Sequence, residues 1–237
     1  NLASLDALQA LYYASEEVER DEFGVFSQSL FDRHHGVESF GWAPLLADAK
    51  RAAHEQGARE NGLAQYLISR VGPHGEVGSA AQRPEYCPLY FLEPHGAELL
   101  TVGLDLRADE RFGRAIEQSR ATGQLTASAP LQLENESGRT PRVLVCAPVY
   151  RTDQSPDSIT QRQRTFKGVF VAVVNIAEVM EEALSPFKSV GIDIYVFDRS
   201  LPGGDQLVYA CASSSRQKQF VPVQTPPRIA AQAPAYV

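Results

Sequence analysis

The sequence predicts an α+β fold in which one long N-terminal helix is followed by short strands and helices. Three observations support this prediction. From Leu2 to Phe31 apolar residues recur at three- and four-residue steps, which is the period of a helix. From Tyr66 onward the apolar period shortens to two, which is the period of a strand. After a polar stretch at 152–164, strands and a helix follow a second time.

The composition is that of an acidic globular protein. The chain has 237 residues, 43% of them apolar and 22% charged, so it can bury a core in one large domain or two ordinary ones. The net charge is −7 and the pI is about 5.3. Phosphate binding needs a concentrated basic face, which this sequence lacks. A nucleic acid or a bare anionic membrane surface is therefore not expected as a partner.

The three cysteines, Cys87, Cys146 and Cys211, are widely spaced and form no C-x-x-C motif. Cys87 and Cys146 lie in apolar, strand-like runs, which is typical of small buried residues. In an oxidising compartment they would also be candidates for a disulfide, and the sequence leaves both interpretations open.

No segment is predicted to span a membrane. The longest apolar run, 168–177, is only about half the length that a spanning helix needs. The first residues enter helical periodicity directly, without the basic and apolar regions of a signal peptide. We therefore expect a piece of a longer protein, in which flanking segments provide any membrane anchor.

The N-terminal helix is predicted to be unusually long. About 30 residues at 1.5 Å each would extend about 45 Å, more than a small domain requires. His34, His35 and Gly36 are suited to its end. A helix of this length is expected to brace two domains and to pair with a second copy of the chain as a homodimer.

A second helix is predicted from Pro44 to Gly57, because proline is favoured in a first helical turn. Its packing side would carry Leu45, Leu46 and Ala49. Trp42, the single tryptophan, precedes it and is interpreted as an anchor for helix packing.

Short strands and one helix are predicted in the middle of the chain. The strands lie at 65–71 and 85–92, and the second is irregular or at an edge because of Pro84 and Pro88. A helix at 108–119 is closed by Thr122-Gly123.

The remaining predicted strands lie at 125–133, 142–150, 166–174, 191–198 and 206–213, with a helix at 176–184, a turn at 201–205 and a proline-rich extended tail after Phe220. The polar segment 152–164 is the expected domain boundary.

No catalytic or metal-binding signature is present. His54-Glu55 lacks the second histidine of a zinc helix, and the adjacent His34 and His35 cannot both face one metal ion. Gly203-Gly204-Asp205 is interpreted as turn chemistry. We expect no cofactor and no metal.

A small-molecule pocket needs an apolar wall with a few polar groups. Strand residues with polar tips suit this role, namely Tyr86, Tyr90, Thr126, Ser128 and Cys146. Arg83 is expected to pair with Glu85 or Asp105.

Five short motifs follow the leading helix in order: Trp42-Ala43-Pro44, Arg83-Pro84-Glu85-Tyr86-Cys87-Pro88, Gly103-Leu104-Asp105, Ala121-Thr122-Gly123 and Pro148-Val149-Tyr150. In this order they resemble the CHASE family of extracytoplasmic sensor domains. Each motif is weak alone, but the ordered set is specific, and the similarity covers most of residues 1–200.

The resemblance implies a long N-terminal helix followed by two tandem PAS-like domains with antiparallel sheets. Residues 1–58 would form the stalk helix and second helix, 59–151 the membrane-distal domain and 165–237 the membrane-proximal domain. Such domains lie outside the membrane in sensor histidine kinases, diguanylate cyclases and related receptors. A kinase or cyclase output domain is accordingly expected in the full-length protein, and no catalysis in this one.

In that family the distal domain binds a small ligand, which in plant receptors is cytokinin. The resemblance and the polar-tipped strands together predict a ligand site of ten residues: Tyr66, Tyr86, Pro88, Tyr90, Leu104, Asp105, Thr126, Ser128, Leu144 and Cys146. Cytokinin receptors carry an aspartate where this chain has Pro84, which offers no side-chain acceptor. A different small ligand is expected.

The expected function is therefore that of an extracytoplasmic sensory domain of a transmembrane receptor. The alternative is a scaffold that senses through protein contact, with a filled core in place of the pocket. A weaker alternative is a hydrolase that uses Glu85 and Asp105.

Overall fold

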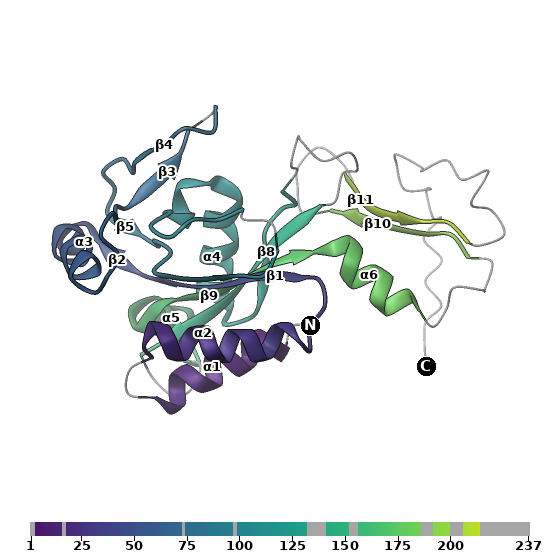
Figure 1. Cartoon of the computed structure of the whole chain (residues 1–237), viewed down its shortest axis with the longest axis horizontal. Helices are drawn as coiled ribbons and strands as arrows, with labels where there is room; N and C mark the ends of the chain where they lie inside the picture. The colour runs from purple at the N-terminus through teal and green to yellow at the C-terminus, as the bar shows by residue number, and fades with distance from the viewer. Residues whose placement is uncertain are drawn as a thin grey trace.

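A five-stranded antiparallel sheet lies at the centre of the protein (Figure 1). This computed structural model describes residues 3–15, 18–72, 74–96, 99–131, 141–151, 156–185, 192–199 and 206–213. Across the sheet the strands are β6 (Phe91–Pro94), β1 (Val37–Pro44), β9 (Phe166–Asn175), β8 (Arg142–Tyr150) and β7 (Thr126–Ala127). The first and last thirds of the chain are thus joined in one sheet.

Helices cover both faces of this sheet, so its central strands are buried on both sides. Successive side chains of a strand point to opposite faces. In β8, Val143, Val145 and Ala147 pack with the N-terminal helices, whereas Leu144 and Cys146 pack on the other side with α4 (Glu110–Thr122). This double burial explains the apolar runs that predicted β8 with its observed bounds and β9 to within one residue.

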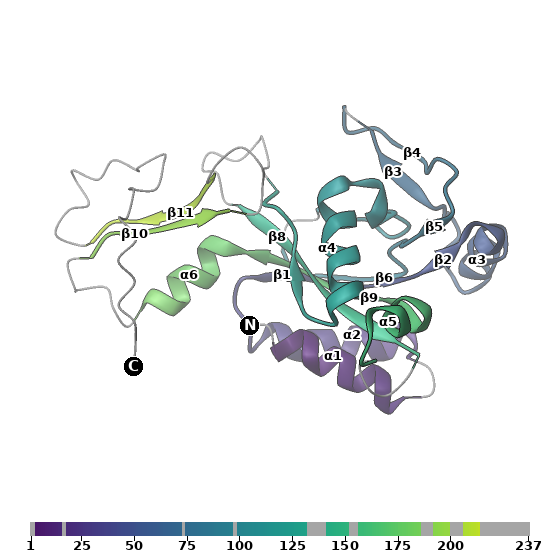
Figure 2. The same cartoon turned by 180° about the vertical axis from the view of Figure 1, so that it is seen from behind.

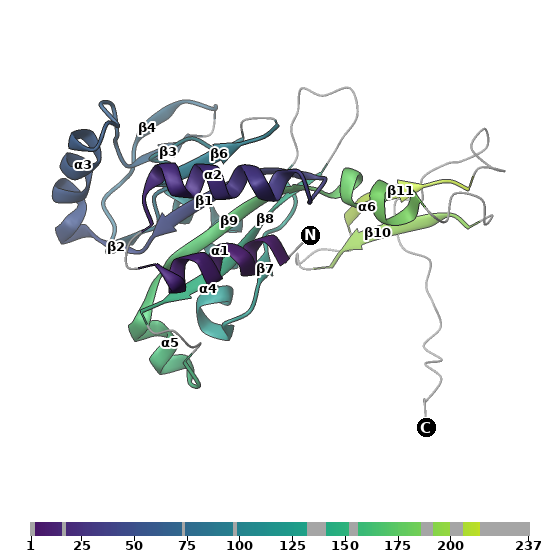
Figure 3. The same ribbon diagram turned by 60° about the horizontal axis from the view of Figure 1, so that its bottom comes forward.

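The N-terminal region forms two helices of 12 residues, α1 (Ala3–Ala14) and α2 (Arg20–Phe31), in place of the predicted single long helix. They lie side by side across one face of the sheet (Figure 3). Glu19 begins α2 with a capping box to Glu22. Because the chain is interrupted, Leu5, Leu8 and Phe23 all reach the same sheet face and are buried there.

On the opposite face, α4 is defined by its caps. The side chain of Asp109 accepts a hydrogen bond from the N–H of Arg111 at the start, and Gly123 adopts a left-handed conformation with φ of 77° at the end. The predicted helix at 108–119 and its glycine stop are therefore confirmed with a small shift. A short 3₁₀ turn, η2 (Leu106–Ala108), precedes it.

The region between β1 and β6 forms a small third cluster. It contains β2 (Leu46–Ala47), η1 (Asp48–Lys50), α3 (Arg51–Glu60), β3 (Ser69–Val71), β4 (Val77–Ser79) and β5 (Glu85–Tyr86). The predicted helix from Pro44 was wrong at its start, because Pro44 ends β1 and the helix begins at Arg51. The backbone N–H of Leu45 donates a hydrogen bond to the carbonyl of Lys167 and not to a helical partner.

Beyond the sheet lie α5 (Ile159–Thr165), α6 (Ile176–Leu184), β10 (Ile194–Asp198) and β11 (Gln206–Cys211). Figure 2 shows α5 beside α4, where Arg162 donates to the carbonyl of Ala121 at 2.9 Å. The α6 helix was predicted with the observed bounds. It leads to the hairpin of β10 and β11 at the far end of Figure 1.

The strand that follows the expected boundary at 152–164 belongs to the central sheet. The β9 strand pairs with β1 on one side and β8 on the other, so it completes the central sheet. Part of the supposedly irregular segment is α5. The turn at 201–205, the tail after Phe220 and the tip joining 133 to 141 lie outside the described residues.

Candidate functional site

The predicted ligand residues on the α4 side belong to a packed core. Leu104, Leu144 and Cys146 are at most 8% exposed, and they contact the apolar side chains that join the sheet to α4. Within the described residues, this side of the sheet is filled by protein side chains at the positions predicted to line a pocket.

Asp105 is the buried polar centre of that side. One carboxylate oxygen accepts hydrogen bonds from the backbone N–H of Cys87 at 2.9 Å and of Arg107 at 3.2 Å. The other oxygen lies 3.4 Å from Nη1 of Arg83 in an ion pair, without a hydrogen bond to the described residues. The expected partnership of Arg83 with Asp105 is confirmed, and it serves to hold segments together.

Tyr86 and Tyr66 lie in the third cluster, away from that core. The hydroxyl of Tyr86 donates to Asp48 at 2.8 Å and accepts from the N–H of Arg83 at 3.1 Å. Hydrogen bonds from Gln82 and Tyr86 lower the pKa of Asp48. The hydroxyl of Tyr66 lies 3.1 Å from Nε2 of His54, and burial raises the pKa of this tyrosine.

The remaining predicted residues are occupied by backbone contacts. Pro88 forms an isolated bridge with Asp105. Ser128 accepts from the N–H of Leu144 at 3.0 Å and donates to the carbonyl of Ala129. Thr126 bonds to the carbonyl of Gln124. The prediction that all ten residues line one pocket stays a prediction, and the structure distributes them over separate clusters.

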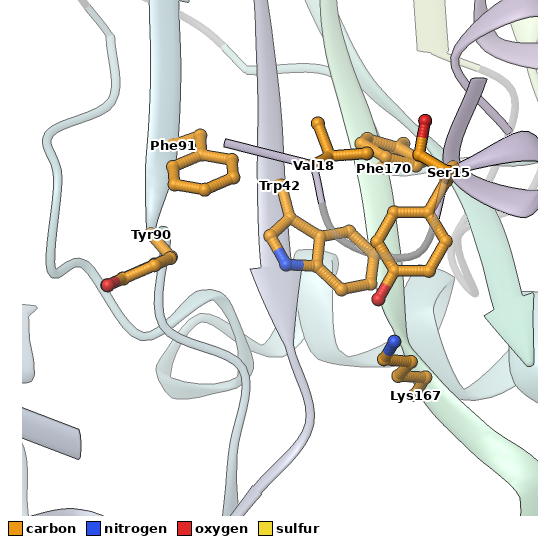
Figure 4. Close-up of a pocket in the computed structure, with 8 residues that line it drawn as sticks. Ser15, Val18, Trp42, Tyr90, Phe91, Lys167 and Phe170 are labelled. Carbon is orange, nitrogen blue, oxygen red and sulfur yellow. The ribbon is translucent and has the colours of Figure 1, made fainter. Parts of the chain in front are cut away.

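A cavity of about 260 Å³ lies on the other face of the sheet, beside the N-terminal helices (Figure 4). Of the predicted residues only Tyr90 lines it. Its walls are Tyr12, Ser15, Val18, Trp42, Tyr90, Phe91, Lys167 and Phe170. They come from α1 and the segment after it, from β1, from β6 and the residue before it, and from β9, so four separate parts of the chain build this one site.

Aromatic rings dominate the walls and pack against one another. Trp42 lies with its ring centroid 5.0 Å from Tyr12 and 4.8 Å from Phe170. Figure 4 shows Trp42 in the middle, with Phe91 and Tyr90 on one side and Phe170 and Lys167 on the other. Mutual packing of this kind holds the rings in place around the cavity.

One cation, Lys167, lines this aromatic cavity, and a second, Arg20, lies against the wall residue Phe91. Nζ of Lys167 is 4.5 Å from the ring centroid of Tyr12, and the Arg20 guanidinium is 5.7 Å from that of Phe91. Arg20 also donates to the carbonyl of Tyr90 at 3.1 Å. Neither cation forms an ion pair with an acidic side chain among the described residues, and none of the described lining residues is acidic.

A second, more open cavity of about 380 Å³ lies beside α4 and includes Pro84, Glu85, Arg107 and Glu117. Its charges already have partners: Arg107 pairs with Glu117, and Arg120 reaches Glu85 at 3.2 Å. The weaker hydrolase hypothesis uses Glu85, which lines this cavity, and Asp105, which does not. However, Arg120 and Arg107 pair with Glu85, and Asp105 is committed to backbone donors.

Sequence reasoning missed most of the aromatic cavity. Trp42 was interpreted as a packing anchor, and Tyr12 as part of a helical stripe. One signal was available, since Lys167, the second residue of the apolar strand β9, is the only charged residue in it. A lysine in an apolar strand does not by itself indicate a site. It does so here only after the pairing of β1 with β9 brings it near the aromatic residues of other segments.

The cysteines are free thiols in the structure. Cys87 and Cys146 are buried, and burial raises the pKa of both, for Cys87 to about 12. Within the described residues, no cluster of three His, Cys, Asp or Glu side chains is arranged to hold a metal ion. In the same part of the chain, no helix has the length and apolar character to cross a membrane.

Comparison with known proteins gives one match to a family. The model described as the CHASE domain matches residues 16–209. No curated protein matches the chain significantly. Among solved structures, one match is a crystal structure of the extracellular domain of a protein described as a histidine kinase, mmHK1S-Z3, with 15% identity and a TM-score of 0.42. The alignment covers 83% of this chain and 58% of that one, and likeness at this level bears on neither family nor function.

Proposed function

The chain belongs to the CHASE domain family, and from this premise we propose that it binds a small molecule outside the membrane and relays this binding to an output domain of the same receptor. The family is one of extracytoplasmic sensory domains of membrane receptors, and this domain is sensory and not catalytic. For the output domain we propose a kinase or a cyclase.

The aromatic cavity is the observation that carries the proposed binding. It combines apolar walls with a few polar groups, as small-molecule sites do. At about 260 Å³ it lies just below the roughly 300–1,000 Å³ usual for drug-sized ligands, which suits a small metabolite. We place the ligand there because the α4 side is filled by Leu104, Leu144 and Cys146.

The position of the cavity supports a route for the relay. Tyr12 of α1 and Ser15, which follows the helix, line one wall, while β1, β6 and β9 contribute to the others. Two polar contacts connect α1 to the sheet: Gln9 donates to the carbonyl of Pro148, and Tyr13 accepts from the N–H of Tyr150. A ligand that binds one placement of α1 more tightly shifts the population toward it.

A thermal-shift screen of metabolites against the chain tests this function. A true ligand at a hundred times its Kd should stabilise the fold by about 2.7 kcal/mol. Ser15→Phe, which fills the cavity, should abolish the shift, whereas Ser29→Phe on the exposed side of α2 should not. A change in the rate of amide hydrogen exchange in α1 when the ligand is added would indicate that binding is relayed through this helix. A screen without any stabiliser, or a stabiliser indifferent to Ser15→Phe, would contradict the proposal.

We also propose that the central sheet is the distal PAS-like domain of the resemblance. Numbered within the sheet by chain order, its strands lie as 2-1-5-4-3, with helices on both faces, which supports one compact sensor unit. In this proposal α6, β10 and β11 belong to the proximal unit. A homodimer through the N-terminal helices would have to use side chains other than Leu5, Leu8 and Phe23, because the sheet buries these three.

Protein contact is the second candidate function, and one surface favours it. Leu67, Val71 and Val77 are 43%, 53% and 64% exposed, and Val71 pairs with Val77 in the hairpin of β3 and β4. Large aliphatic side chains grouped on a surface are typical of interaction sites. If this function holds, the double variant Val71→Ser/Val77→Ser of the full receptor would lose signalling. No small molecule would stabilise either the unchanged receptor or this variant.

A further inference from the structure

We infer that the aromatic cavity selects a small planar aromatic ring that carries a carboxylate group. This inference rests on the proposed function and names the chemical class of the ligand. It follows from the two kinds of group that meet in the cavity: flat ring walls and cations without acidic partners among the described residues.

The ring walls specify a flat apolar ligand. Tyr12, Trp42 and Phe170 pack on one another, and Tyr90 and Phe91 form a separate pair with centroids 4.9 Å apart. A ring inserted between these groups would bury its faces and edges against aromatic surface, which favours aromatic over saturated ligands. The volume of about 260 Å³ limits the ligand to one or two fused rings.

The polar groups specify an acceptor with negative charge. The indole N–H of Trp42 forms no hydrogen bond with a described acceptor, Nζ of Lys167 is a donor only, and the Arg20 guanidinium flanks the wall. Donors and positive charge together match a carboxylate, whose oxygens accept from both ammonium and N–H groups.

A cationic ligand is the competing chemistry, because aromatic cages bind ammonium groups. Such sites attract the cation through ring faces and need no other cation nearby. Here Tyr12 already faces Lys167, and Phe91 already faces Arg20. A bound ammonium group would meet the like charge of Lys167, and none of the described lining residues carries an acidic side chain, so its binding is disfavoured.

The chain contains a single tryptophan, Trp42, so its fluorescence reports on this cavity alone. Four probes separate charge from ring shape: benzoate, neutral benzamide, cationic benzylamine and cyclohexanecarboxylate. Benzoate should change Trp42 emission saturably. Benzamide and cyclohexanecarboxylate should each bind at least roughly tenfold more weakly, because one lacks the charge and the other the ring. Benzylamine should not bind measurably.

Substitutions then assign the charge to its residue. Lys167→Met keeps the apolar stem and should weaken benzoate roughly tenfold to a hundredfold, the loss of one charge-assisted hydrogen bond, without changing benzamide. Lys167→Arg should restore most of the binding. Lys50→Met, which removes an exposed lysine of η1, should leave every probe unchanged. Lys50 and Lys167 are both exposed, and thermal melting verifies that both variants fold.

Benzylamine binding as tightly as benzoate, or Lys167→Met leaving benzoate binding intact, would overturn the ligand class. Trp42 emission that is unchanged by all four probes would also overturn it. A different result would contradict the proposed function itself: a broad metabolite screen that finds no stabiliser whose effect is lost in Ser15→Phe. A stabiliser of another chemical class would retain the function and reject the aromatic carboxylate.

Discussion

Asp105 joins two segments of the chain, 83–87 and 105–107. It accepts from Cys87 and Arg107, and its second oxygen pairs with Arg83. Its side chain is fully buried. Loss of charge at such a position removes an ion pair and leaves polar atoms without suitable partners. At the scale of single residues, Asp105 is therefore a structural group that the sequence alone presented as a ligand contact.

Asp105→Asn should lower the free energy of unfolding by about 1–3 kcal/mol. Urea denaturation measures the loss. Asp109→Asn is the matched control, because Asp109 caps α4 from a half-buried position and asparagine caps helices about as well as aspartate. Its effect should stay within about 0.5 kcal/mol. Equal losses in both variants would contradict the structural role of Asp105.

His54 gives a pH dependence of stability. Burial lowers the pKa of this histidine below 6.5, so the unfolded chain binds the proton more readily than the folded chain. Its stabilising contribution is complete above about pH 6.5 and is lost as the pH falls from there toward the lowered value. Unfolding at a series of pH values should show this loss, and His54→Gln should reduce it. An unchanged slope in the variant would assign the effect to other groups.

At the scale of elements, local chemistry explains where α4 ends. Gly123 has a φ of 77°, a conformation that costs any residue with a Cβ about 1 kcal/mol. Gly113 lies inside the same helix, and a Cβ there would meet the Arg107 carbonyl at an ordinary 3.5 Å. α4 thus has one glycine inside it and one at its C-terminal cap, with opposite roles.

Alanine substitution should therefore have opposite signs at the two positions. Gly123→Ala should destabilise the fold by about 1 kcal/mol, and Gly113→Ala should stabilise it by about 0.5–1 kcal/mol. Thermal or chemical unfolding of both variants checks the pair. Destabilisation by both would show that helix propensity does not govern position 113.

The N-terminal helices show what periodicity alone leaves open. The same apolar spacing fits one helix of 30 residues or two of 12, because the stripe does not record a reversal of the chain. Burial of Leu5, Leu8 and Phe23 on one sheet favours the pair. The capping box at Glu19 is the local signal that the long-helix prediction overlooked.

At the scale of the whole molecule, the sheet separates two cores and leaves its cysteines in unlike environments. Cys87 and Cys146 are buried on the α4 side, whereas Cys211 on β11 is half-buried. Raised pKa values keep the two buried thiols protonated at neutral pH, and the thiolate is the reactive form.

A thiol reagent added to the native chain near pH 7.5 should modify Cys211 alone. In denaturant all three cysteines should react. Cys211→Ser should remove the fast reaction, and mass spectrometry identifies the modified site. Rapid modification of Cys87 or Cys146 in the folded chain would show that the α4-side core opens readily.

The sequence by itself determined the elements whose signals are local. The apolar runs fixed β8 and β9, Gly123 fixed the end of α4, and the ordered motifs indicated the CHASE family. Only the tertiary structure decided the β1 strand, whose partners β6 and β9 lie far along the chain. It also decided the aromatic cavity. Tyr12, Trp42 and Lys167 are neighbours because strand pairing and helix packing close long loops. The sequence around these residues contains no local pattern that shows which distant segments will meet.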